Sequence, residues 1–301
     1  MELATIMEAL RENRDRKLPR EALEQAIAQK EEITPLLLAE ITLTPEKLAE
    51  IQGNWGYIRH LYAFYLLAQF RETQAYPVMI DFVSTSGEAI MEIMPDLVTG
   101  DLGCILASVC GGDLSSIKQL IENTSCNDYV REAGLKALIT LVVEEELSRE
   151  SVLEYIEELW PKVQQEESDD DVLYHSLIMG GLDLCPNESL SILFRDAYEN
   201  NRVDPHWSRI GDLDKAIEMG IEESIARLSS RQYHRFVTDV IASMGWWACF
   251  QGSAPKQKRV VPAGLTFTSE FSDPKKGNAK RKKKRQAQKQ ARKQNRSKKK
   301  R

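Results

Sequence analysis

Basic side chains crowd the C-terminal end of the chain and offer the clearest chemistry in the sequence. Residues 275–301 hold sixteen Lys or Arg, no Asp or Glu, and no aromatic residue. A polycation of this kind binds nucleic acid because it releases the counterions condensed on the phosphates, with steep salt dependence and little sequence preference. Without aromatic side chains, the run itself offers no stacking of bases. The residues expected to bind RNA or another polyanion are Lys275, Lys276, Lys280, Arg281, Lys282, Lys283, Lys284, Arg285, Lys289, Arg292, Lys293, Arg296, Lys298, Lys299, Lys300 and Arg301.

The charge is divided between this end and the rest of the chain. Residues 253–301 hold 19 basic and 2 acidic residues, a net +17, whereas residues 1–252 hold 21 basic and 44 acidic residues, a net −23. This division indicates a polyanion-seeking tail on an acidic body. Two other interpretations stay open: a tail that only keeps the protein soluble, and a tail folded back on the body's own charge. The pattern does not separate RNA from DNA or from an acidic protein.

Cysteine and histidine are present, but not at the spacing of a metal site. A structural zinc site needs four Cys or His, usually as two close pairs, and the sequence contains no Cys-x-x-Cys. We predict no bound metal and no cofactor, and the odd number of thiols is typical of a reduced, cytosolic protein. The residues concerned are His60, His175, His206 and His234, with Cys104, Cys110, Cys126, Cys185 and Cys249.

Motifs of covalent or nucleotide chemistry are also missing from the sequence. It contains no Gly-x-Ser-x-Gly, no phosphate loop and no Gly-x-Gly-x-x-Gly. The acidic run 166–171 lacks the spacing of a calcium loop, and we interpret it as the cap of a helix that begins near Val172. The chain is therefore predicted not to be an enzyme.

The alternative is an enzyme or regulator whose site combines residues dispersed along the sequence. Trp55, His60 and Tyr62 lie in one strongly apolar segment and could line a groove. Their exposure together in a pocket would favour this alternative, and their burial in the core would favour a scaffold.

The elements that position these residues are predicted to be helices throughout. Apolar residues recur at three- and four-residue steps, which predicts an all-α fold, and Thr44-Pro45-Glu46 is a helix start signal. Helices follow one another in pairs whose starts fall roughly 30 to 45 residues apart, as in HEAT or armadillo repeats. The predicted pairs are 61–70 with 77–83, 102–109 with 114–121, 129–143 with 151–160, and 172–184 with 189–198.

Three segments are predicted along the chain. Residues 1–252 form the acidic helical-repeat domain, and Trp246-Trp247 is expected to seal the exposed end of the last repeat. Residues 253–274, with three prolines, are a linker, and residues 275–301 are a disordered tail. No apolar segment is long enough to cross a membrane and no secretion signal is recognised, so we expect a cytoplasmic protein without membrane contact.

Four segments resemble an uncharacterised bacterial family, domain of unknown function 1186. They are HLYAFYLLAQFRE (60–72), ILASVCGGD (105–113), the run from Ile117 to Val143, and WWACF (246–250). The resemblance covers most of residues 15–250 and implies a HEAT-like helical body with no established activity. Some relatives end in a small zinc-binding motif related to one in the preprotein translocase ATPase. This sequence has no cysteine after Cys249, so that metal site is not carried over.

Together these features predict a non-enzymatic adaptor. The concave face of the helical body would hold an unknown protein partner, and the basic tail would hold RNA or another polyanion. Because residues 1–252 repel phosphate, changes at Trp55 or Trp246 are expected to alter nucleic-acid binding only through folding.

Overall fold

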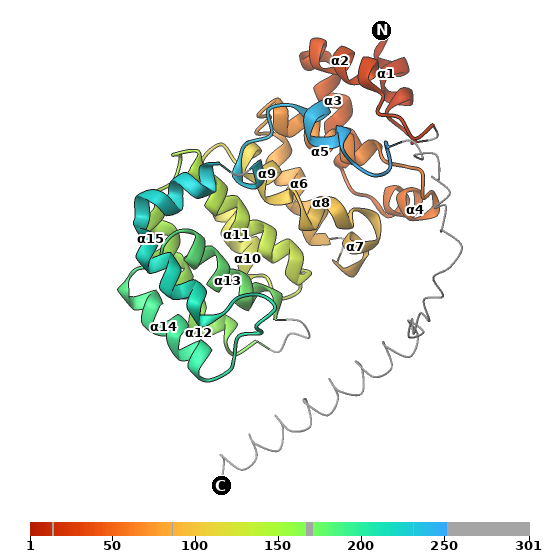
Figure 1. Ribbon diagram of the computed structural model, residues 1–301. Coiled ribbons are helices and arrows are strands. Elements are labelled where there is room, and N and C mark those ends of the chain that lie inside the picture. The colour runs from red at the N-terminus through yellow and green to blue at the C-terminus, as the bar shows by residue number, and fades with distance from the viewer. Residues whose placement is uncertain (14, 86, 167–170, 231, 252–301) are drawn as a thin grey trace, which may run out of the picture. The chain divides into compact units, whose positions relative to one another are not determined.

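The chain folds into helices joined by loops (Figure 1). The computed structural model describes residues 1–251 except 14, 86, 167–170 and 231. Within them every element is helical, apart from one isolated antiparallel bridge between Glu12 and Tyr57, so the all-α prediction is confirmed. The elements are α1 (Leu3–Ala9), α2 (Arg20–Ala28), α3 (Lys30–Ile41), α4 (Pro45–Gly53), α5 (Arg59–Gln69), α6 (Ala75–Thr85), the 3-10 helix η1 (Gly87–Ala89), α7 (Ile90–Ile93), α8 (Pro95–Thr99), α9 (Leu102–Val109), α10 (Ser115–Glu122), α11 (Asp128–Val143), α12 (Arg149–Val163), α13 (Val172–Asp183), α14 (Glu188–Glu199), α15 (Ile210–Ser229), the 3-10 helix η2 (Gln232–His234) and α16 (Val240–Gly245).

The predicted linker, residues 253–274, and the predicted tail, residues 275–301, lie outside the described residues. Both stay predictions from the sequence.

Two predicted helix starts lie where the sequence signals place them. At α4 the Thr44 hydroxyl accepts a hydrogen bond from the Lys47 N–H at 3.1 Å, and Pro45 is the first helical residue, as expected. The helix α13 begins at Val172, and Asp171 of the acidic run is its N-cap residue as predicted, but the Asp171 side chain makes no capping hydrogen bond to the first turn. An N-cap side chain reaches the first turn from an extended backbone, whereas Asp171 has a left-handed backbone with φ +50°.

The helices of the four predicted pairs are all present, as α5 and α6, α9 and α10, α11 and α12, and α13 and α14. The first helices of the pairs form a row, in which α5 packs on α9, α9 on α11, and α11 on α13. Gly181 permits close contact inside the last pair, because a Cβ there would lie 2.6 Å from the Phe194 ring of α14. The assignment to a particular repeat class stays a prediction.

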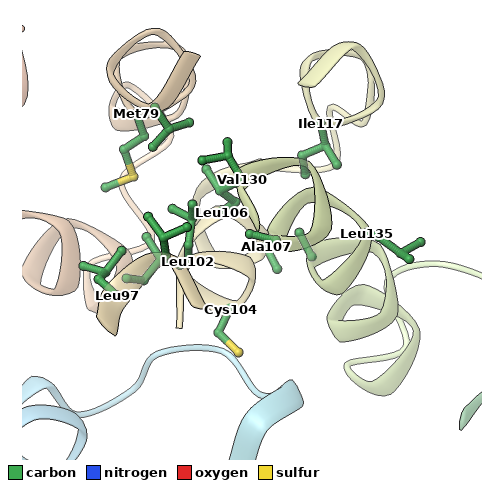
Figure 2. Packing of buried hydrophobic residues seen from close by; sticks show 14 of the residues in the cluster. Met79, Leu97, Leu102, Cys104, Leu106, Ala107, Ile117, Val130 and Leu135 are labelled. Atoms are coloured by element: carbon green, nitrogen blue, oxygen red, sulfur yellow. The ribbon is translucent and has the colours of Figure 1, made fainter. Parts of the chain in front are cut away.

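Buried aliphatic side chains from neighbouring helices fill the core. Figure 2 shows Leu102 and Leu106 of α9 between Met79 of α6 and Val130 of α11. All four side chains are completely buried. Burial of each side chain of this size stabilises the fold by roughly 1.5–3 kcal/mol relative to an exposed one. The packed helices in turn fix the positions of the loops that connect them.

The last described part of the chain returns along this row of helices. We call residues 232–250 the closing segment; they include η2, which packs on α11 and α9, and α16, which packs on α5 and α2. The Val237 N–H donates to Ser108 Oγ of α9 at 2.9 Å, and the Val240 N–H donates to Gln69 Oε1 of α5 at 2.8 Å. A partner of this face therefore has to bind beside the closing segment or displace it.

The Trp246-Trp247 pair does not seal the last repeat, so that prediction is wrong. Trp247 packs edge-on against Tyr65 of α5, with ring centroids 5.8 Å apart. Trp247 lies on the first helix of the first predicted pair, because the closing segment passes α11 and α9 before it reaches α5 (Figure 1).

Candidate functional site

The three dispersed residues of the enzyme alternative do not lie together. His60 and Tyr62 of α5 are buried in the core, whereas Trp55, in the loop after α4, is 98% exposed. The His60 ring stacks with the rings of Tyr57 and Phe82, with centroids 5.9 and 6.4 Å away. Burial lowers the pKa of His60 to about 4, so the imidazole is neutral near pH 7. These side chains therefore do not form one shared site.

A network of charged side chains lies beneath the Trp55 loop. Glu40 comes from α3, Lys47 and Glu50 come from α4, and Arg59 begins α5. The Lys47 ammonium lies 3.3 Å from Glu40 Oε2 and 3.2 Å from Glu50 Oε2. Arg59 Nε donates to Glu40 Oε2 at 2.8 Å. Tyr57 donates its hydroxyl proton to Glu40 and accepts hydrogen bonds from Lys47 and Arg59.

The electrostatics of this network keep Tyr57 protonated. Burial, reinforced by the hydrogen bond to Glu40, raises the pKa of the Tyr57 hydroxyl. Burial opposes the charge of Lys47, but its hydrogen bonds to Tyr57 and Glu50 and the charge of Glu40 outweigh burial and raise its pKa. The ion pairs and hydrogen bonds of this network thus form a buried brace, by which we mean that they connect α3, α4 and the start of α5 to one another.

The loop after α4 presents Trp55 on a fixed backbone. Asn54 Oδ1 accepts from the Gly56 N–H at 3.1 Å, and Asn54 Nδ2 donates to Glu12 Oε1 at 3.0 Å. From the other side the Asn13 N–H donates to the Gly56 carbonyl at 3.0 Å. Both residues next to Trp55 are therefore held in place while its indole points into solvent.

A second exposed tryptophan lies at the end of the closing segment. Trp246 is the C-cap residue of α16 and is 69% exposed, whereas its neighbour Trp247 is partly buried. Asn13 Nδ2 donates to the Cys249 carbonyl at 3.1 Å. Asn13 therefore links the Trp55 loop to the end of the closing segment.

Asn13 belongs to the most basic part of the body, residues 11–20, which we call the basic loop. It holds five basic and two acidic residues, a net +3, while no other successive block of ten residues up to 250 exceeds +1. Arg16, Lys17 and Arg20 are exposed, and Arg14 lies outside the described residues. The candidate functional site is this basic loop with the exposed indoles of Trp55 and Trp246.

The polyanion-binding residues predicted from the sequence, Lys275 to Arg301, lie outside the described residues, so their role stays a prediction. The five cysteines are free thiols, of which only Cys249 is partly exposed. Between residues 1 and 251, with the gaps given above, no group of three or more His, Cys, Asp or Glu is placed to hold a metal ion. No helix of that part of the chain is long and apolar enough to cross a membrane.

The combination of the basic loop with the two tryptophans was not predicted from the sequence. The signal in residues 11–20 was present, but it is small beside the sixteen basic residues at the C-terminal end. The contact could not be found by periodicity, because Asn13 and Cys249 are 236 residues apart.

Comparison with known proteins places most of the chain in one group. The model of the family described as protein of unknown function DUF1186 matches residues 1–251. An uncharacterized protein of Chlamydia trachomatis serovar D is 37% identical over 208 residues, 69% of this chain and 80% of that protein. An uncharacterized protein of Chlamydia muridarum is also 37% identical over 208 residues, 69% of this chain and 81% of that protein. No solved structure matches significantly.

Proposed function

The chain belongs to the DUF1186 family, and we propose that it is a non-enzymatic adaptor that binds an RNA-like polyanion through its C-terminal tail and a protein partner through its helical body. The observation that carries the proposal is the division of charge, with +17 on residues 253–301 and −23 on residues 1–252. A body of this charge repels phosphate, so affinity for a polyanion has to come from the cationic end.

The protein-binding half of the proposal is supported by apolar side chains on the last long helices. Ile192 of α14 and Ile217 and Ile221 of α15 are exposed. Ile217 and Ile221 are four residues apart, although the non-helical backbone at Gly220 kinks the helix between them. Exposed apolar side chains that gather on neighbouring helices are typical of protein contact surfaces.

The tail is tested by comparing the full chain with a chain that lacks residues 275–301. Both are titrated into labelled single-stranded RNA at two salt concentrations. If about six tail charges contact phosphate, the log–log slope of affinity against salt is about −4 for the full chain. We expect the deletion to remove most of the binding and most of its salt dependence. Equal binding by the two chains, or binding indifferent to salt, contradicts the polyanion half of the proposal.

A further inference from the structure

We propose that Trp55 and Trp246 form a stacking platform for the unpaired bases of single-stranded nucleic acid, with the basic loop as its phosphate contact. This inference rests on the proposed polyanion-binding function and narrows the polyanion to one class. It also revises the expectation that these tryptophans act only through folding, since both indoles are on the surface.

The exposure of the two indoles is the first observation. Burying a large aromatic side chain is strongly favourable, yet Trp55 is 98% exposed and Trp246 is 69% exposed. Trp55 makes almost no contact with the body, so packing within the body gives no reason for an indole there. An exposed, rigid aromatic side chain is typical of a binding anchor.

The rigidity of both supports is the second observation. Asn54 and Asn13 hold Gly56, so the Trp55 backbone is fixed although its side chain is free. Trp246 is held because its neighbour Trp247 packs on Tyr65. A platform fixed before binding loses less conformational entropy when a base stacks on it.

The charge between the two indoles is the third observation. Asn13 of the basic loop contacts the backbone at Gly56, next to Trp55, and at Cys249, three residues after Trp246. Arg16 Nη2 donates to the Ala248 carbonyl at 3.4 Å, two residues after Trp246, and Arg16 remains exposed. Cationic side chains therefore lie beside the tryptophans, where the phosphates of a strand would follow its stacked bases.

The acidic residues of this region do not cancel the positive charge. Glu12 accepts a hydrogen bond from Asn54, and Glu50 forms an ion pair with Arg11 at 3.2 Å. Asp15 is exposed and subtracts one charge, leaving residues 11–20 at +3. The region therefore stays attractive to phosphate on a body that is otherwise acidic.

Single-stranded nucleic acid fits this combination better than other anions do. Unpaired bases expose flat faces that stack on indole rings, and the adjoining phosphates pair with Arg and Lys. Bases inside a duplex are already stacked on one another, and heparin has no bases. The C-terminal tail lacks aromatic residues, so the platform supplies a preference for single strands that the tail cannot supply.

The test uses the full chain with Trp55→Ala and Trp246→Ala combined. The matched control is Tyr233→Ala, which removes an aromatic ring that is 64% exposed on η2, away from the basic loop. The probes are a labelled single-stranded oligoadenylate RNA, the same length of duplex RNA, heparin, and vesicles of anionic phospholipid. We expect the double variant to bind the single strand at least about tenfold more weakly, because the loss of a single stacked base already predicts about tenfold. Binding of duplex and heparin is expected to change less than about twofold, and Tyr233→Ala is expected to match the unchanged chain.

A charge variant tests the phosphate contact separately. Arg16→Gln, Lys17→Gln and Arg20→Gln together are expected to make the salt slope for the single strand shallower by about 2. Lys215→Gln, at an exposed lysine of α15, is expected to leave the slope unchanged. An equal slope for the triple variant and the unchanged chain overturns the role of the basic loop.

Three results overturn the platform itself: unchanged single-strand affinity in the double tryptophan variant, an equal loss for heparin, or a loss confined to the anionic vesicles. Circular dichroism of the variants excludes unfolding as the cause of a loss. The platform proposal and the tail proposal can be refuted independently of each other. If the chain without residues 275–301 binds the single strand as well as the full chain but depends on Trp55 and Trp246, the tail proposal fails and the platform stands.

Discussion

Glu40 pairs with two cations at once, and its carboxylate is almost completely buried. The side chain is 3% exposed, and Lys47 and Arg59 beside it are under one fifth exposed. Removing one partner from a buried ion pair typically costs about 3–5 kcal/mol, because it leaves an uncompensated charge behind. We expect Glu40→Gln to lower the free energy of unfolding by about 3 kcal/mol, measured by urea denaturation.

Glu50 provides the matched control, because it contacts the same lysine from the solvent side. Its side chain is 36% exposed, and partly exposed pairs contribute less than about 1 kcal/mol. Glu50→Gln is therefore expected to cost less than about 1 kcal/mol. An equal cost for the two substitutions would show that the network is not a buried brace.

The burial of His60 predicts that the stability of the protein falls as the pH is lowered. Its pKa falls from 6.5 in the unfolded chain to about 4 in the folded protein because burial disfavours the charged ring. The unfolded state binds a proton first as the pH falls, so stability is complete above pH 6.5 and declines as the pH falls from there toward 4. As the pH falls from 7 to 5, protonation of this group in the unfolded chain lowers the free energy of unfolding by roughly 2 kcal/mol.

The measurement compares the unchanged chain with His60→Gln by urea denaturation at several pH values. The difference in unfolding free energy between them is expected to shrink by that roughly 2 kcal/mol between pH 7 and pH 5. A difference independent of pH would mean that His60 is protonated or hydrated in the folded protein.

At the scale of elements, the hydroxyl of Ser108 helps to hold the closing segment on α9. Ser108 Oγ donates to the Cys104 carbonyl at 2.7 Å and accepts from the buried Val237 N–H. In Ser108→Ala that N–H loses its acceptor, at a cost of about 1–3 kcal/mol. We expect faster hydrogen exchange in residues 235–241, with α9 and α11 still protected, because only the closing segment is released.

Ser191→Ala is the control for that change. Ser191 Oγ also donates to a carbonyl four residues earlier, that of Asn187 at 2.7 Å, but this bond stays within the first turn of α14 and its N-cap. The control is expected to leave exchange in the closing segment unchanged. Faster exchange throughout the protein in Ser108→Ala would argue against an independently opening segment.

At the scale of the whole molecule, the helices could be predicted and their final contacts could not. The period of apolar residues is local, so the four helix pairs and the Thr44 cap were accessible from the sequence. The return of the closing segment was not, because its bond from Val240 to Gln69 spans 171 residues. The exposure of Trp55 was also hidden, since an indole in an apolar segment is usually part of the core.

The same scale carries a prediction about proteolysis. Trypsin cleaves after Lys and Arg, and residues 275–301 hold sixteen of them, whereas the helices restrain the backbone of the body. We expect limited digestion to remove this end first and to leave a fragment close to residues 1–252, identified by mass spectrometry. Initial cleavage inside the helical body, with the C-terminal end intact, would contradict the predicted division of the chain.

The link between Asn13 and Cys249 has a consequence for the order of synthesis. The ribosome makes α1 more than two hundred residues before the closing segment, and closing so long a loop is a late and entropically costly event. Until then the apolar faces of α5 and α9 that it covers stay open, which is the condition under which nascent chains associate or engage chaperones. A message truncated before residue 232 would therefore yield a chain that exposes these apolar faces and tends to aggregate, and not a smaller working protein.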